Sequence, residues 1–204
     1  MGCGGNDDPV TPSAPTGGGG GGGSTTLTAT TVESVSFTID GVNRSYTSGA
    51  GNVQIVFSNS GSSGTPTSTK SYGCGFYNVA TDESLLEFNW GKFEQPGFGI
   101  PSDDLFFSWF STGEVPYGDP ELEIGKAEVL MYEGPPTYEI WSSKCGAQDG
   151  ESFNVTSLVE IPNSITYDRL KYRVTFNCKL YRCSGSGTRT ITNGTAVVLL
   201  ENSI

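Results

Sequence analysis

The sequence contains no histidine among its 204 residues. Histidine is the most frequent general base of enzymes and the most frequent metal ligand. Its absence therefore weighs against acid–base catalysis, a catalytic triad and a histidine-based metal centre. We expect that this protein is not an enzyme.

Positive charge is also scarce. Lysine and arginine together number 11 against 22 aspartate and glutamate residues, which leaves a formal charge of -11 at pH 7. Such a charge repels phosphate backbones and other polyanions, so we expect no nucleic-acid partner.

Long apolar runs are missing as well, because no stretch of 18 apolar residues occurs, and such a stretch is what a membrane-spanning helix needs. Apolar residues make up 35% of the chain, but aromatic residues reach 11%, which argues for an ordered core. We expect two regions: an anchor and linker over residues 1–26, and one domain over residues 27–204.

The first residues are compatible with lipid attachment. Met1-Gly2-Cys3 resembles the end of a bacterial lipoprotein signal, in which a small residue precedes the cysteine that receives the lipid. Asp7-Asp8 resembles the short export signal of Bacteroidota lipoproteins that reach the cell surface. The resemblance implies a removed signal peptide, a lipid on Cys3, and an outer-membrane protein that faces the cell surface.

Two other interpretations of this start remain open. Met-Gly-Cys also begins doubly acylated eukaryotic proteins, although the myristoylation pattern requires serine or threonine where this chain has Asn6. Alternatively, Met1 and Gly2 stand in place of a signal that was cut away, and Cys3 then carries no lipid in this material.

Between Asp8 and Thr26 the chain consists almost entirely of Pro, Thr, Ser and Gly, with an uninterrupted glycine run from Gly17 to Gly23. Such a segment buries too little apolar area to offset the entropy of ordering. The chain of about 23 residues after Cys3, as a random coil, would reach on the order of 25 Å. We expect a flexible spacer between membrane and domain.

From Val32 onward, apolar residues alternate with polar ones between turn-forming clusters, which is typical of β-strands. The clearest example is Leu170 to Leu180, where every second residue is apolar. Only Ser102 to Phe110 favours a short helix, with Ser102 as its N-cap. We predict an all-β fold: a single antiparallel β-sandwich of roughly 8–10 strands. The apolar faces of the other predicted strands start at Val35, Val53, Leu86, Ala127, Tyr138, Phe153 and Ala196.

Three segments carry a family resemblance. "YEIWSSKCGAQDGESFNVTS" and "YRVTFNCKLYRCSGSGTRTITNGTAVV", together with "LFFSWFSTGEVPY" from Leu105, resemble parts of small uncharacterised Bacteroidota lipoproteins. The resemblance implies a β-sandwich at the cell envelope and no known activity. The chain departs from that pattern at Thr175, where glycine is common, and at Ala196, where phenylalanine is common.

Four cysteines lie within the expected domain: Cys74, Cys145, Cys178 and Cys183. An even number in an exported domain indicates disulfides. Strand alternation places Cys178 and Cys183 on opposite faces, so each is expected to pair with Cys74 or Cys145 and to stabilise the fold by about 3 to 5 kcal/mol. Four unpaired thiols are the alternative. A zinc site lacks C-x2-C spacing, and we expect no metal and no cofactor.

Carboxylates that could form an acid pair are the basis of an alternative, glycoside-active function. They are Asp103-Asp104, Asp82-Glu83, and Glu121 with Glu123. Adjacent acids more often cap helices or face solvent, and no D-x-D-x-D-G loop is present to bind calcium. Catalysis by these residues is therefore not our main expectation.

Aromatic residues offer another alternative, a carbohydrate-binding module. Trp109, Tyr117 and Trp141 are candidates for exposed rings that stack on sugars. Two such rings, for example Trp109 and Trp141, would have to be coplanar and exposed on one face. Burial of both would remove the basis of this alternative.

Three cations alternate along the clearest strand, at Arg169, Lys171 and Arg173. They either form a docking face for an acidic partner or blunt a solvent-exposed sheet face with charge. We expect a surface lipoprotein that binds a ligand or serves in an outer-membrane complex, with a protein subunit or a glycan as possible partners.

Overall fold

The computed structural model describes residues 26–62, 64, 66–81, 83–134, 139–162 and 167–203. Cys3 and nearly all of the expected tether lie outside the described residues. The elements are β1 Ser34–Ile39, β2 Val42–Thr47, β3 Val53–Ser62, β4 Thr67–Asn78, β5 Glu83–Pro96, α1 Asp103–Ser108, β6 Gly113–Glu114, β7 Lys126–Glu133, β8 Glu139–Ser142, η1 Ser143–Cys145, β9 Ser152–Ile161, β10 Arg169–Arg182 and β11 Thr188–Glu201.

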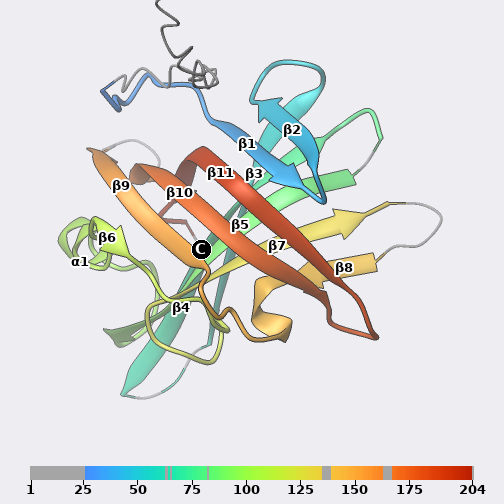
Figure 1. Cartoon of the computed structure of the whole chain (residues 1–204). Helices are drawn as coiled ribbons and strands as arrows, with labels where there is room; N and C mark the ends of the chain where they lie inside the picture. The colour runs from blue at the N-terminus through green and yellow to red at the C-terminus, as the bar shows by residue number, and fades with distance from the viewer. Residues whose placement is uncertain are drawn as a thin grey trace, which may run out of the picture.

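The strands form one 11-stranded sheet in the order β2-β1-β11-β10-β8-β7-β5-β4-β3, in which β9 also pairs with β10 and with β6. The pairings between these strands are antiparallel. β10 connects the two halves of the sheet (Figure 1). It pairs with β11 along one edge, and along its other edge it pairs first with β9 and then, near its C-terminal end, with β8. The all-β prediction is confirmed.

The sheet curls so that its two halves face each other across a single core. Phe88 of β5 packs edge-on against Phe176 of β10 with ring centroids 5.1 Å apart. Trp90 of β5 meets Tyr172 of β10 at 5.6 Å in the same manner. These strands are not hydrogen-bonded neighbours in the sheet. The rings therefore come from opposite walls and close the core.

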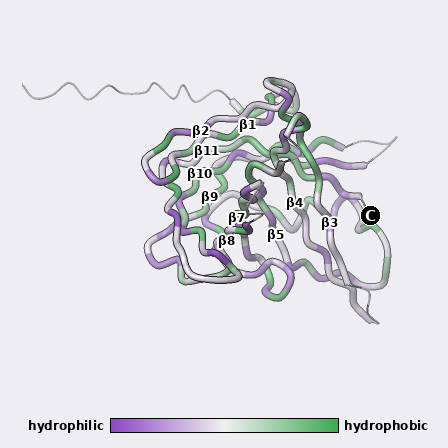
Figure 2. The backbone as a smooth tube through the Cα atoms, turned by 90° about the vertical axis from the view of Figure 1, so that its right-hand side faces the viewer, coloured by the Kyte–Doolittle hydropathy of each residue, from purple (hydrophilic) through white to green (hydrophobic). Residues whose placement is uncertain are grey.

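Side-chain alternation along the strands builds these walls. On β10 the apolar series from Leu170 to Leu180 is buried, as the sequence predicts. Polar and apolar positions alternate in short stretches along the backbone in Figure 2. The helix prediction is confirmed too, since α1 begins after Ser102, whose hydroxyl accepts a hydrogen bond from the Leu105 amide at 3.4 Å. No described helix is long and apolar enough to cross a membrane.

The expectation that Lys171 lies on a solvent-exposed face is wrong. Lys171 is 4% exposed, because the chain just before β1 passes over it. Its ammonium contacts the Glu33 carboxylate at 2.8 Å and donates to the carbonyls of Ala29 and Thr31. The charge of Lys171, at an outward position of β10, is thus covered by the chain before β1, which lies about 140 residues away in sequence.

The cysteine prediction is confirmed for one pair and wrong for the other. Cys145 and Cys183 form a disulfide with a Cα–Cα distance of 5.3 Å. Cys74 and Cys178 are buried free thiols. Both point into the core, where they act as small apolar side chains.

Candidate functional site

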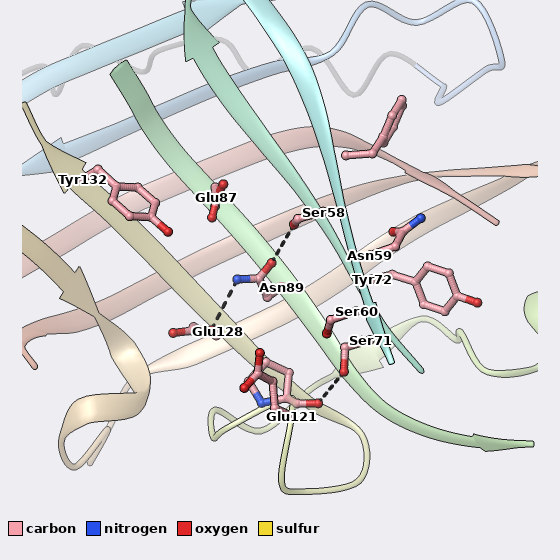
Figure 3. A pocket seen from close by; sticks show the side chains of 12 residues that line it. Ser58, Asn59, Ser60, Ser71, Tyr72, Glu87, Asn89, Glu121, Glu128 and Tyr132 are labelled. Carbon is pink, nitrogen blue, oxygen red and sulfur yellow. Dashed lines mark hydrogen bonds between the residues drawn. The ribbon is translucent and has the colours of Figure 1, made fainter. Parts of the chain in front are cut away.

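A hollow of about 390 Å³ lies on the outer face of β3, β4, β5 and β7, away from the core (Figure 3). Most of its side chains are polar, which distinguishes this patch of sheet from the apolar face beneath it. It is lined by Phe57, Ser58, Asn59, Ser60, Ser71, Tyr72, Glu87, Asn89, Pro120, Glu121, Glu128 and Tyr132.

Strand register aligns the polar groups of the hollow in one row. Ser58 of β3 pairs with Gly73 of β4, Gly73 with Asn89 of β5, and Asn89 with Glu128 of β7. Directly paired residues of an antiparallel sheet project from the same face. The Ser58 hydroxyl donates to Asn89 Oδ1 at 3.2 Å, and Asn89 Nδ2 donates to Glu128 Oε2 at 3.3 Å.

Two glycines of β4 lie beneath the polar side chains of the hollow. Gly73 and Gly75 occupy outward positions of β4 between the inward residues Tyr72, Cys74 and Phe76. A Cβ at Gly73 would collide with the Ser58 hydroxyl and with Asn89 Oδ1. A Cβ at Gly75 would lie 2.7 Å from Glu87 Cγ. Glycine therefore lets polar side chains from the neighbouring strands lie across β4.

Glu128 is the most buried acid of the hollow, with 2% of its surface exposed. The Ser142 hydroxyl donates to its Oε1 at 2.5 Å, and Lys144 Nζ lies 3.8 Å from the same oxygen. Burial raises the pKa of Glu128 above its ordinary range, and the contacts with Ser142, Lys144 and Asn89 oppose that rise. This carboxylate is held in one position by partners on three sides.

Glu87 lies on β5 next to this row, and its carboxylate has a different environment. No hydrogen bond or ion pair reaches it from the part of the chain that the structure describes. Burial raises the pKa of Glu87, and the nearby negative charge of Glu128 raises it further. Figure 3 shows Glu87, Asn89 and Glu128 together on the sheet, with Tyr132 beside them.

The loop over residues 118–125 forms one wall of the hollow. Ser71 Oγ donates to the Pro120 carbonyl at 2.7 Å, and the Lys92 amide donates to the Glu123 carbonyl at 2.8 Å. Lys144 Nζ lies 3.5 Å from an Asp119 carboxylate oxygen. These contacts fix the loop to β4, β5 and η1, so the hollow is preformed.

The aromatic candidates lie elsewhere, and the structure corrects their expected exposure. Trp141 is buried, 8% exposed, under the guanidinium of Arg189. Trp109 is half-buried and stacks on Phe93 with ring centroids 5.0 Å apart. The Tyr117 hydroxyl donates to the Asn177 carbonyl at 2.8 Å. These three rings pack against other parts of the protein, so the expected pair of exposed tryptophans is not formed.

The basic residues of β10 do not form an open stripe. Arg169 binds the Glu201 carboxylate at 2.7 Å and 2.9 Å through two guanidinium nitrogens. Lys171 is buried with Glu33, as described above, and Arg173 is half-buried and not free of partners. Internal ion pairing explains much of the basic pattern that suggested a docking face.

The sequence-predicted acid pairs are not gathered at one place. Asp103 and Asp104 lie in the first turn of α1. Glu121 lines the hollow, whereas Glu123 turns back to accept a hydrogen bond from the Asp119 amide. Asp82 lies outside the described residues. Within the described ranges, no group of three or more cysteine or acidic side chains could hold a metal ion.

Sequence reasoning missed Glu87, Asn89 and Glu128 as site residues. A signal for them existed. Glu87 and Asn89 are the outward residues of a strand whose inward face is strongly apolar, and Glu128 interrupts the apolar run from Ala127 to Met131. The alternation alone could not show that they meet, because β5 and β7 are joined by a connection of about 30 residues.

Searches against protein-family models, curated proteins and solved structures find no match to this chain.

Proposed function

We propose that this chain is a lipid-anchored binding subunit of the bacterial outer membrane, facing the cell surface, that acts without catalysis and holds its ligand in the hollow. The lipoprotein-like start at Cys3 and the resemblance to Bacteroidota lipoproteins support the location. The hollow supports the binding role. An outer-membrane protein complex or a glycan is the class of partner that this location favours.

The observation that carries the proposal is the aligned polar row that crosses the glycine positions of β4. Ser58 of β3, Asn89 of β5 and Glu128 of β7 are connected by hydrogen bonds in a row that crosses four strands, and the absence of a side chain at Gly73 lets Ser58 and Asn89 meet over β4. Binding sites supported by strands keep their groups in place before the ligand arrives, which lowers the entropy cost of binding. A solvent-exposed sheet face has no need of such an arrangement.

Binding fits this geometry better than glycoside hydrolysis. That reaction places two carboxyl groups on opposite sides of the bond that is cleaved. Glu87 and Glu128 instead project from the same face of the neighbouring strands β5 and β7 (Figure 3). The arrangement supplies two acceptors to one side of a ligand.

Purification of the lipidated protein from gently solubilised outer membranes tests the binding role. Ser58→Tyr places a large ring in the hollow, and Gln54→Tyr is a matched control at an exposed position of the same strand. We expect mass spectrometry to find a stoichiometric ligand with the wild type and with Gln54→Tyr, and to lose it with Ser58→Tyr. Equal recovery from both variants, or no ligand from the wild type, contradicts the proposal.

The anchor is tested separately. Intact-mass analysis of the native protein should show an N-terminal Cys3 that carries a diacylglycerol, and Cys3→Ser should release the protein from the membrane fraction. An internal, unmodified Cys3 in native protein contradicts the proposed location without affecting the binding role.

A further inference from the structure

The charges around the hollow do not balance. Glu87, Glu121 and Glu128 line it, and no lysine or arginine is among the lining residues. Lys144 approaches from outside, but its ammonium lies between Asp119 and Glu128, at 3.5 Å and 3.8 Å. It therefore compensates Glu128 and Asp119 and leaves Glu87 without a cation.

Glu87 is the group that this imbalance affects most. Its side chain is partly buried beside the fully buried Glu128, and among the described residues nothing donates a hydrogen bond to its carboxylate. Taking a carboxylate out of water without a partner costs several kcal/mol in general, so such a group either binds a proton or binds a cation. The Glu87 side chain lies across Gly75, where a Cβ would come within 2.7 Å of its Cγ.

We propose that the hollow binds a small organic cation, with a primary ammonium or guanidinium group that pairs with Glu87. This inference rests on the proposed function and names its ligand class. The cation replaces the missing partner of Glu87 and lies close to Glu128, whose position is fixed by Ser142 and Asn89.

The rest of the hollow suits a ligand that is polar beyond its charged group. The hydroxyls of Ser58, Ser60 and Tyr132 line the same space and both donate and accept hydrogen bonds. A volume of about 390 Å³ lies at the lower end of the range for small-molecule sites, which fits a molecule of the size of an amino sugar or a diamine. The described residues offer no metal-binding cluster.

The test is an NMR titration of the ¹⁵N-labelled full chain with cadaverine, and with 1,5-pentanediol as the neutral molecule of the same length. A single charged contact in water gives weak binding, so the titration extends to about 50 mM. We expect cadaverine, and not pentanediol, to shift the backbone amides of Gly73, Gly75 and Asn89. A second pair of probes, glucosamine and glucose, extends the comparison to ring-shaped ligands.

Two variants identify the carboxylate. Glu87→Gln keeps the shape of the side chain and removes its charge, and we expect it to weaken cadaverine binding about tenfold or more, equivalent to about 1.4 kcal/mol. Glu94→Gln removes the same charge from an exposed position of the same strand and should leave binding unchanged. The spectrum of each variant also shows whether it is folded.

The outcomes separate this inference from the function on which it rests. Equal responses to charged and neutral probes, or equal binding by wild type and Glu87→Gln, overturn the cation and leave the hollow as a binding site. Absence of any response at the hollow overturns the cation as well. If the native ligand is in addition retained by Ser58→Tyr, the proposed function fails too.

Discussion

The buried ion pair between Lys171 and Glu33 allows a quantitative prediction about stability. The Lys171 side chain is 5% exposed and the Glu33 side chain 15%, and their charged atoms lie 2.8 Å apart. Glu33→Gln removes the negative partner and leaves the ammonium with only the Ala29 and Thr31 carbonyls. An uncompensated buried charge costs about 3 to 5 kcal/mol, so we expect Glu33→Gln to lower the free energy of unfolding by about 3 kcal/mol.

Lys171→Met should cost less, about 1 to 2 kcal/mol, because methionine fills the buried space with an apolar chain and the more exposed Glu33 can be hydrated. Urea unfolding followed by tryptophan fluorescence measures both values. In a chain of this size a loss of 3 kcal/mol lowers the melting temperature by about 6 to 12 °C. The double variant should be more stable than Glu33→Gln alone. The reasoning is refuted if Glu33→Gln costs under about 1 kcal/mol or less than Lys171→Met.

Three further predictions follow from the same structure. Reduction of the Cys145–Cys183 disulfide, which spans 38 residues, should lower the free energy of unfolding by about 4 kcal/mol in urea; a loss below about 1 kcal/mol contradicts the expected chain-entropy effect. Cys74 and Cys178 should react with a maleimide only after unfolding, because both are buried and burial raises the pKa of Cys74 to about 12; rapid labelling of folded protein contradicts this placement. Burial raises the pKa of Glu87 above 4.5, so the folded state holds this proton to higher pH than the unfolded state, and the contribution of Glu87 to the free energy of unfolding should fall as pH rises from 4.5; the difference in free energy of unfolding between wild type and Glu87→Gln should therefore change with pH in that direction, and parallel pH profiles contradict it.

The binding surface differs from the one that aromatic content alone suggests. Trp109 and Trp141 are used inside the protein, one stacked on Phe93 and one beneath Arg189. A curled sheet has to fill a wide core, and large rings do this well. On the outer face of β4, by contrast, Gly73 and Gly75 have no side chains. The side chains of Ser58, Asn89 and Glu87 from the neighbouring strands occupy the space that side chains on β4 would fill.

Much of the fold could be predicted because its signals are local. Alternation along β5 and β10 indicates which residues face the core, and it does so correctly for Phe88, Trp90 and Phe176. The N-cap preference of Ser102 likewise depends only on its own turn. Local geometry determines these features, so no knowledge of distant segments is needed.

Other features depended on segments that meet only in the folded chain. Alternation placed Lys171 correctly on the outward side of β10, but it could not show that the chain before β1 covers that side. It also placed Cys178 inward, yet only the packing shows that Cys74 is not bonded to it. Which thiols come within bonding distance is a property of the three-dimensional arrangement.

The sequence by itself determined that this is a β protein with one face of each long strand in the core. Only the tertiary structure decided that Ser58, Gly73, Asn89 and Glu128 share one row, and that Ser58, Asn89 and Glu128 line one hollow. The physical reason is register. The period of two along a strand is encoded residue by residue, whereas the alignment of four strands is set by the packing of the entire sheet.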